Sequence, residues 1–236
     1  MTGSTILLYT SGTKPFVQRF FDEHYCQSKR VNFNFTCIAS NAWNSENSVV
    51  ILQRKPQSSV MYTGIFEAIL QGIESLPDDQ VVFFAEDDCL YHESRYADEF
   101  VSLSLQEPGR LYYQTNVSFI CPAGFYKPTI SGICLHSAFG TVAAIRHNIQ
   151  HKLAEYNGET EFPITSVEPV SYPTPENPDP AFAIYRTRCI QTTIPVSLDF
   201  RGYGVQSWQP DGSEPTWQTD DIWGESKSLW HHMIES

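Results

Sequence analysis

Residues 81–88 read Val-Val-Phe-Phe-Ala-Glu-Asp-Asp, a continuous apolar run that ends in three carboxylates. Five consecutive apolar residues are typical of a strand that is covered on both faces of a sheet. In sheets built from parallel strands, ligands bind at the carboxyl ends of the strands. The acidic triplet at positions 86–88 therefore lies where the sequence predicts a binding site.

Strands and helices alternate on the N-terminal side of this run. Thr5 to Tyr9 and Phe33 to Ala39 are short apolar segments that we expect to be strands. Between the second of these and residue 81, apolar residues recur at helical spacing, and Ser58 or Ser59 is expected to cap the helix. Its apolar positions are Met61, Ile65, Ile69, Ile73 and Leu76. The alternation predicts an α/β fold whose mostly parallel central sheet is flanked by helices.

The C-terminal half of the chain is less regular. We predict a strand at Leu111 to Phe119, a helix from Val142 to Tyr156 and a strand at Arg186 to Pro195. Between Leu153 and Tyr185 there is no Lys or Arg and there are many prolines, which predicts a long loop or a small insertion near 160–181.

Composition narrows the class of protein. The chain has 236 residues, enough to bury a substantial core, and a formal charge of −12, which argues against a general nucleic-acid coat protein. No apolar run is long enough to span a bilayer, and the first residues do not resemble a signal peptide. The cysteines are scattered and form no Cys-x-x-Cys pair of a zinc site. We therefore expect a cytoplasmic protein without a membrane partner.

The acidic triplet has a functional and an ordinary interpretation. If the extended conformation persists, Glu86 and Asp88 point to one side of the strand end and Asp87 to the other. Two carboxylates on one side can hold Mg²⁺ or Mn²⁺ together with diphosphate oxygens. The alternative is a solvated acidic turn.

The residues that follow the triplet carry a family resemblance. Leu90-Tyr91-His92, Ser94 and Tyr96 match a pattern that reads Val-Leu-Tyr-His-Pro-Ser-His-Phe after a Glu-His-Asp or Glu-Asp-Asp strand, with Glu93 and Arg95 as departures. The segment from Ser58 to Phe100 thereby resembles a group of A-type glycosyltransferases of bacteria and phages, those like the base-J glucosyltransferase.

Later segments extend the resemblance over most of the chain. Tyr112 to Val117 is similar to the family's Tyr-Asn-Thr-Asn-Val strand, and the segment from Phe139 to Tyr156 stands where the family has a helix. Residues 197–202 and 222–224 are similar to its Asp-Ile-Arg-His-Gly and Tyr-Trp-Gly elements. Gly202-Tyr203-Gly204 stands where the family has a histidine after the arginine, so a non-catalytic descendant that only binds a nucleotide-sugar stays open as an alternative.

The resemblance implies an A-type glycosyltransferase domain over 1–236, with a nucleotide-sugar-binding half at 1–100 and an acceptor-binding half at 101–236. It implies sugar transfer from a nucleotide-sugar, expected to be UDP-linked, with Mn²⁺ or Mg²⁺ as the cofactor. The residues expected to act fall into four groups: Glu86 and Asp88 for the metal; Tyr9, Thr10, Ser11, Ser40 and Asp87 for the nucleotide; Asp88 and Asp199 for catalysis, with Asp220 and Asp221 as rivals of Asp199; and His92, Asn116, Arg201 and Trp223 for the substrate.

The acceptor is the most open expectation. Related transferases of phages glycosylate hydroxymethylated pyrimidines in DNA, and Arg186 and Arg188 would share one face of a strand that could contact phosphates. A polysaccharide or a protein hydroxyl is the alternative. Two other enzyme classes fit less well. The segment from Thr10 to Lys14 is too short for the Gly-rich loop of a nucleotidyltransferase, and the sequence lacks the His-x-His pair that a metal-dependent hydrolase would need.

Overall fold

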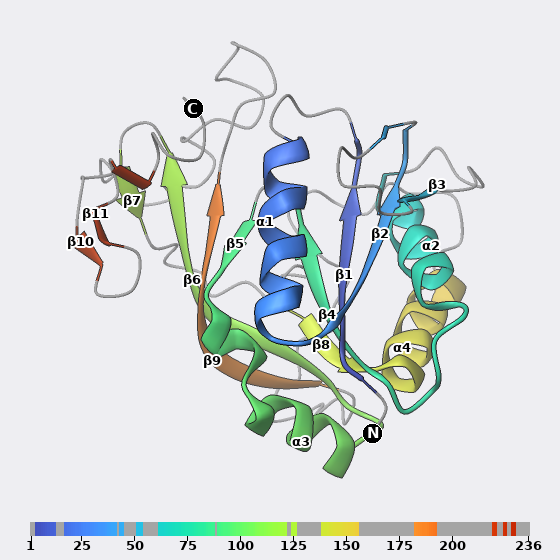
Figure 1. Cartoon of the computed structure of the whole chain (residues 1–236). Coiled ribbons are helices and arrows are strands. Elements are labelled where there is room, and N and C mark those ends of the chain that lie inside the picture. The colour runs from blue at the N-terminus through green and yellow to red at the C-terminus, as the bar shows by residue number, and fades with distance from the viewer. Residues whose placement is uncertain are drawn as a thin grey trace.

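The computed structural model describes residues 3–12, 17–41, 43–44, 51–53, 61–87, 89–121, 124–126, 138–155, 182–192, 219–220, 224–225 and 228–229. Within these residues one large mixed sheet runs through the molecule, with strand order β3-β2-β1-β4-β8-β6-β9-β5 and β7 paired to β6. Figure 1 shows the sheet with helix α1 in front of it.

The first half of the sheet is parallel. Strand β1 (Thr5–Thr10) lies between β2 (Asn34–Ala39) and β4 (Val81–Glu86), and β3 (Ile51–Gln53) extends the sheet beyond β2. Helix α1 (Val17–Arg30) connects β1 to β2. Because parallel strands end at the same edge, the last residues of β1, β2 and β4 lie next to one another.

The second half mixes directions. Strand β8 (Ala138–Thr141) is antiparallel to both β4 and β6 (Leu111–Cys121), and β6 then pairs in parallel with β9 (Phe182–Thr192). The short strand β5 (Cys89–Tyr91) is antiparallel to β9, so the chain reverses direction after β4. The remaining elements are α2 (Met61–Ile73), the 3-10 turn η1 (Glu93–Tyr96), α3 (Asp98–Gln106), β7 (Gly124–Tyr126), α4 (Val142–Glu155), β10 (Thr219–Asp220) and β11 (Gly224–Glu225).

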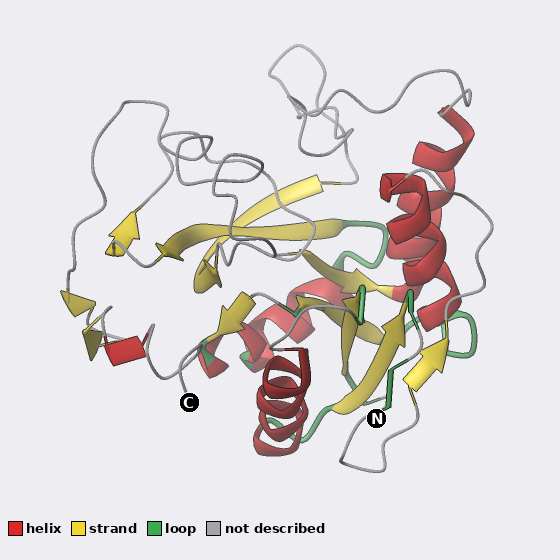
Figure 2. Cartoon of the chain, turned by 90° about the horizontal axis from the view of Figure 1, so that it is seen from above, coloured by secondary structure: helices red, strands yellow, loops and turns green. Residues whose placement is uncertain are grey.

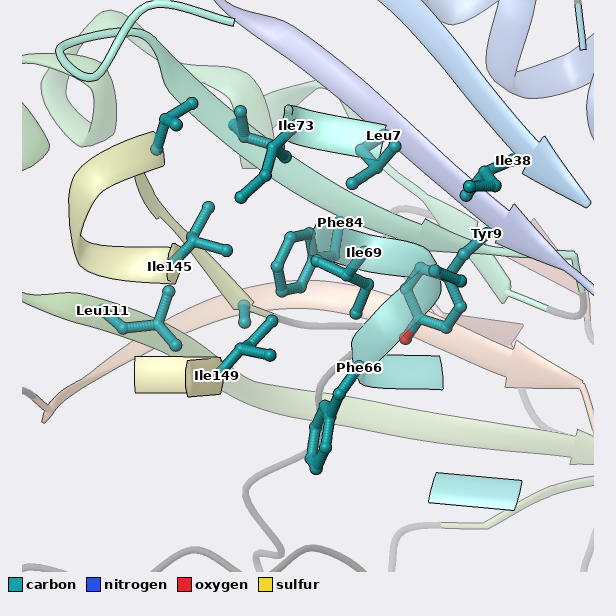
Figure 3. Close-up of a cluster of buried hydrophobic side chains, with 14 residues drawn as sticks. Leu7, Tyr9, Ile38, Phe66, Ile69, Ile73, Phe84, Leu111, Ile145 and Ile149 are labelled. Carbon is teal, nitrogen blue, oxygen red and sulfur yellow. The ribbon is translucent and has the colours of Figure 1, made fainter. Parts of the chain in front are cut away.

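Helices cover both faces of the sheet, as the view from above shows (Figure 2). Helices α2 and α4 pack on one face, which we call the α2/α4 face, against a mainly aliphatic core that includes Leu7, Ile38, Ile69, Val82, Ile145 and Ile149 (Figure 3). Helices α1 and α3 pack on the opposite α1/α3 face, where the core is mainly aromatic and includes Phe21, Phe83, Tyr91, Tyr96, Phe100, Tyr112 and Phe139. No helix within the described residues is long and apolar enough to cross a membrane.

The predicted α/β fold with a mostly parallel central sheet flanked by helices is confirmed. The strands expected at 5–9, 33–39 and 111–119 and the helices expected around Ile69 and Ile145 are present. The strand expected at Arg186 to Pro195 begins earlier, at Phe182, and its described part ends at Thr192. Phe139 belongs to β8 and not to the helix that follows it, which begins at Val142. Ser58, Ser59 and residues 160–181 lie outside the described residues.

Candidate active site at the carboxyl ends of strands β1, β2 and β4

The ends of three strands bring together the residues predicted to contact a nucleotide. Tyr9 pairs with Glu86 in the register of β1 and β4. On the other side of β1, the Ser40 backbone N–H donates to the Thr10 carbonyl over 3.0 Å, and the Asn41 N–H donates to the Ser11 carbonyl over 3.1 Å. The predicted set of Tyr9, Thr10, Ser11 and Ser40 is therefore contiguous at one edge of the sheet.

Glu86 and Asp87 turn their carboxylates to opposite sides of the sheet. The Tyr9 hydroxyl donates a hydrogen bond to the Glu86 carboxylate, and the Thr10 hydroxyl donates one to the Asp87 carboxylate. Tyr9 and Thr10 are neighbours in a strand, so their side chains point to opposite faces. The predicted alternation is thus confirmed for Glu86 and Asp87, and the position of Asp88 lies outside the described residues.

Glu86 is held at three points. Its side chain is half-buried and bonds to Tyr9, its backbone N–H donates to the Tyr91 hydroxyl over 3.2 Å, and its backbone carbonyl lies 2.9 Å from Nε2 of His24. A carbonyl oxygen only accepts hydrogen bonds, so Nε2 of His24 carries the proton. These contacts fix the direction in which the strand end presents its carboxylate.

Helix α1 supplies a second tie to the same part of the chain. Nε2 of Gln27 donates to the Tyr91 carbonyl over 2.5 Å. His24 and Gln27 are three residues apart and therefore lie on one side of the helix. Together they join α1 to the chain reversal between β4 and β5. Sequence reasoning missed this role. The sequence signal that could have indicated it is that two polar residues follow the apolar residues Phe20 and Phe21 on the same helix.

Burial controls the protonation of this region. His24 is 1 % exposed, and desolvation lowers its pKa to about 4, with the charge of Arg95 acting in the same direction, while its bond to Glu86 and the charge of Asp87 oppose the shift. The pKa of the buried Cys37 thiol is raised, chiefly by desolvation and also by the charge of Asp87. Both groups are therefore neutral near pH 7.

The turn after β1 is shaped by Gly12. Its φ of +74° lies in the left-handed region that favours glycine, and a Cβ there would lie 3.2 Å from the Asn41 carbonyl oxygen. The Gly12 N–H donates to Oγ1 of Thr10 over 2.9 Å. The Thr10 hydroxyl thus connects the turn to Asp87, which is 3 % exposed.

A divalent ion could be held only in part by the described residues. No three His, Cys, Asp or Glu side chains gather into a metal-binding group in the part of the chain that is described. Glu86 offers a hard carboxylate at the exposed edge, whereas Asp87 is buried against Thr10. A complete site at this edge would need Asp88, as the sequence predicts.

The predicted substrate residues are less concentrated. His92 lies beyond β5 and caps η1, where its Nδ1 accepts from the Ser94 N–H over 3.2 Å. Asn116 pairs with Arg188 across β6 and β9, but a register shift just before this pair places an extra residue in β9 between Tyr185 and Arg188. Asp199, Arg201, Trp223 and Asp221 lie outside the described residues, and Asp220 is in β10.

No protein-family model and no curated protein sequence matches the chain. A solved structure described as a glycosyltransferase involved in the glycosylation of the major capsid of PBCV-1 is similar at 14 % sequence identity and a TM-score of 0.47, covering 78 % of this chain and 82 % of that one. At this level of similarity the likeness by itself assigns no function.

Proposed function

We propose that the protein transfers a sugar from a nucleotide-sugar to an acceptor hydroxyl, with Mn²⁺ or Mg²⁺ bound at the edge of the sheet by Glu86 and Asp88. The observation that carries the proposal is the fixed carboxylate of Glu86 at the carboxyl end of β4, beside the ends of β1 and β2. A carboxylate that is held in place before the reaction can bind a divalent ion, and that ion would stabilise the negative charge that develops on the diphosphate.

The proposed reaction is displacement at the anomeric carbon of the donor sugar. The acceptor oxygen forms a bond to that carbon, and the bond from the carbon to the diphosphate oxygen breaks with its electron pair leaving on the diphosphate. A divalent ion, when bound, supplies positive charge to the departing diphosphate. Asp199 is proposed to take the proton of the acceptor hydroxyl, with Asp220 and Asp221 as the alternatives.

The nucleoside is proposed to bind where the first two strands end. Backbone groups and hydroxyls of Thr10, Ser11 and Ser40 line this edge, and uridine is the proposed base. The supporting geometry is the hydrogen-bonded contact between the β1 and β2 ends. Thermal shifts with UDP, GDP and CDP test the choice of base: UDP should stabilise most, and a clear preference for GDP would exclude it.

The acceptor to test first is a hydroxymethylated pyrimidine in DNA, with a polysaccharide or protein hydroxyl as the alternative outcome. The residues proposed to contact the acceptor are His92, Asn116, Arg201 and Trp223. DNA containing hydroxymethylcytosine or hydroxymethyluracil would be offered with a labelled UDP-sugar and Mn²⁺, beside unmodified DNA. Transfer to neither modified DNA, by an enzyme that hydrolyses its donor, would remove the DNA acceptor.

The transfer reaction itself is tested through Glu86. Glu86→Gln keeps an acceptor for the Tyr9 hydroxyl but removes the charge, so hydrolysis of UDP-glucose should fall at least tenfold. Glu67 is a half-buried glutamate of α2, and Glu67→Gln is the matched control, which should leave the rate of UDP-glucose hydrolysis unchanged. If wild type binds UDP-sugar yet neither hydrolyses nor transfers it, the protein is the non-catalytic descendant instead.

A further inference from the structure

A groove of about 400 Å³ runs between helix α1 and the segment that contains β5. One wall is a stripe along the whole of α1, and the other is Leu90 to Glu93, with Leu229 from the C-terminal part of the chain. The volume is within the range of small-molecule sites, roughly 300–1,000 Å³. The groove therefore has the size to take a small ligand, and one of its lining residues, His92, is also a proposed substrate contact.

The floor of the groove contains two buried polar side chains that are fixed in place. His24 is 1 % exposed and Gln27 is 5 % exposed, and each uses its Nε2 to donate to a backbone carbonyl. Each therefore keeps one acceptor, Nδ1 of His24 and Oε1 of Gln27. Among the residues that the structure describes, no group donates a hydrogen bond to either atom. A ligand that fits this floor must bring hydrogen-bond donors.

The charges along the groove indicate a neutral ligand. Arg19 and Arg30 are balanced by Glu23 and Glu93. Eleven residues of helix separate the two arginines, about 16 Å at 1.5 Å per residue, so they stand toward opposite ends of the stripe. The carboxylates oppose an anionic ligand such as a diphosphate, and the guanidinium groups oppose a polyamine.

The remaining lining provides apolar surface. Phe20 and Tyr91 lie in its walls at 1 % and 4 % exposed, and Leu90 contributes a half-buried aliphatic side chain. A ligand with hydroxyls that donate and accept, no net charge and some apolar C–H surface meets these requirements, because the apolar walls contact its C–H groups while polar side chains bind the hydroxyls. Saccharides have this chemistry.

We propose that the groove between α1 and β5 is a second site, which binds a neutral saccharide. The proposal is independent of the transferase proposal, since a saccharide could bind here whether or not sugar is transferred at the strand ends. His24 joins the two regions, because it lines the groove and bonds the Glu86 carbonyl.

The test uses the full chain on an array of neutral glycans, anionic glycans, oligonucleotides and polyamines, followed by calorimetry with the strongest neutral glycan. Arg30→Gln and Glu93→Gln alter exposed groove residues and should each weaken binding at least tenfold. Arg110→Gln, an exposed arginine of the Glu107 ion pair outside the groove lining, is the control and should bind like wild type.

Three results would overturn the saccharide site: no neutral glycan bound above background, equal binding by the groove variants and wild type, or preference for the anionic ligands or polyamines. UDP binding with Mn²⁺ is measured on the same variants and should not change. Loss of glycan binding with intact UDP binding separates the groove from the nucleotide edge, so that either proposal can fail without the other.

Discussion

The two faces of the sheet are built from different side chains. On the α2/α4 face, aliphatic residues from two helices fill the space over β1 and β4. On the α1/α3 face, aromatic rings dominate, and buried polar groups lie among them: His24, Gln27, Asp87 and Arg95. Arg95 is 0 % exposed, and its guanidinium carbon lies 4.0 Å from the centre of the Tyr91 ring.

Both faces contribute to stability, and the buried polar groups give the α1/α3 face a further role. An aliphatic core needs only volume and close packing, whereas buried polar groups are costly unless each is bonded. On the α1/α3 face His24 and Gln27 bond to the backbone of the segment 86–91, which carries the predicted metal-binding carboxylates, whereas Asp87 accepts from Thr10 and Arg95 donates to the Ala138 carbonyl. We infer that this face positions the acidic edge and that the α2/α4 face serves mainly to hold the sheet.

The largest expected effect comes from the aromatic face. Phe139 stacks on Phe83 with ring centres 4.9 Å apart and on Tyr112 at 5.4 Å. Phe139→Ala should lower the free energy of unfolding by about 3–5 kcal/mol. Ile145→Ala, a truncation to the same residue on the opposite face, should cost about 2–5 kcal/mol. Urea denaturation measures both, and a loss below about 1 kcal/mol in either variant would show that its face is not closely packed there.

Acid should act on the α1/α3 face through His24. Its pKa is lowered from 6.5 to about 4 in the fold, so the folded protein binds fewer protons than the unfolded chain between these values. The contribution of neutral His24 to the free energy of unfolding is therefore fully present above pH 6.5. It falls by roughly 3 kcal/mol as the pH is lowered from 6.5 to 4.

His24→Gln keeps a donor for the Glu86 carbonyl and removes the titration. The free energy of unfolding of this variant should fall less between pH 6.5 and pH 4 than that of wild type. The exposed Gln150 on α4 supplies the control, since Gln150→Asn changes no titratable group and should keep the wild-type pH dependence. A wild-type slope in His24→Gln would show that another group titrates.

A smaller effect sharpens the account of the α2/α4 face. A Cβ on Gly72 of α2 would lie 2.8 Å from Cδ1 of the buried Leu7. Overpacking costs about 1–3 kcal/mol, against a gain of about 1 kcal/mol in helix propensity, so Gly72→Ala should be neutral to destabilising by up to about 2 kcal/mol. Gly109→Ala has nothing within 4 Å and should change stability by less than about 0.5 kcal/mol. A clear gain from Gly72→Ala would mean that the helix can move away from β1.

The sequence predicted the parallel half of the fold well, because its strands are apolar runs and its helices have clear apolar stripes. It did not predict α3, in which only Phe100 and Ser104 are buried, so the helical pattern is weak. The opposite directions of Glu86 and Asp87 followed from strand alternation. The bonds from His24 and Gln27 to the segment 86–91 could not be predicted, since they join residues more than 60 positions apart.

The account depends most directly on whether the acidic edge binds a nucleotide through a metal ion. Calorimetry would titrate UDP into wild type and Asp88→Ala, each with Mn²⁺ and with EDTA, and thermal melting would check that the variant is folded. Asp79→Ala, an exposed carboxylate before the start of β4, is the control. We predict UDP binding that needs Mn²⁺ in wild type and in Asp79→Ala, and that is lost in Asp88→Ala. Full metal-dependent binding by folded Asp88→Ala, or UDP binding that EDTA does not change, would contradict the account.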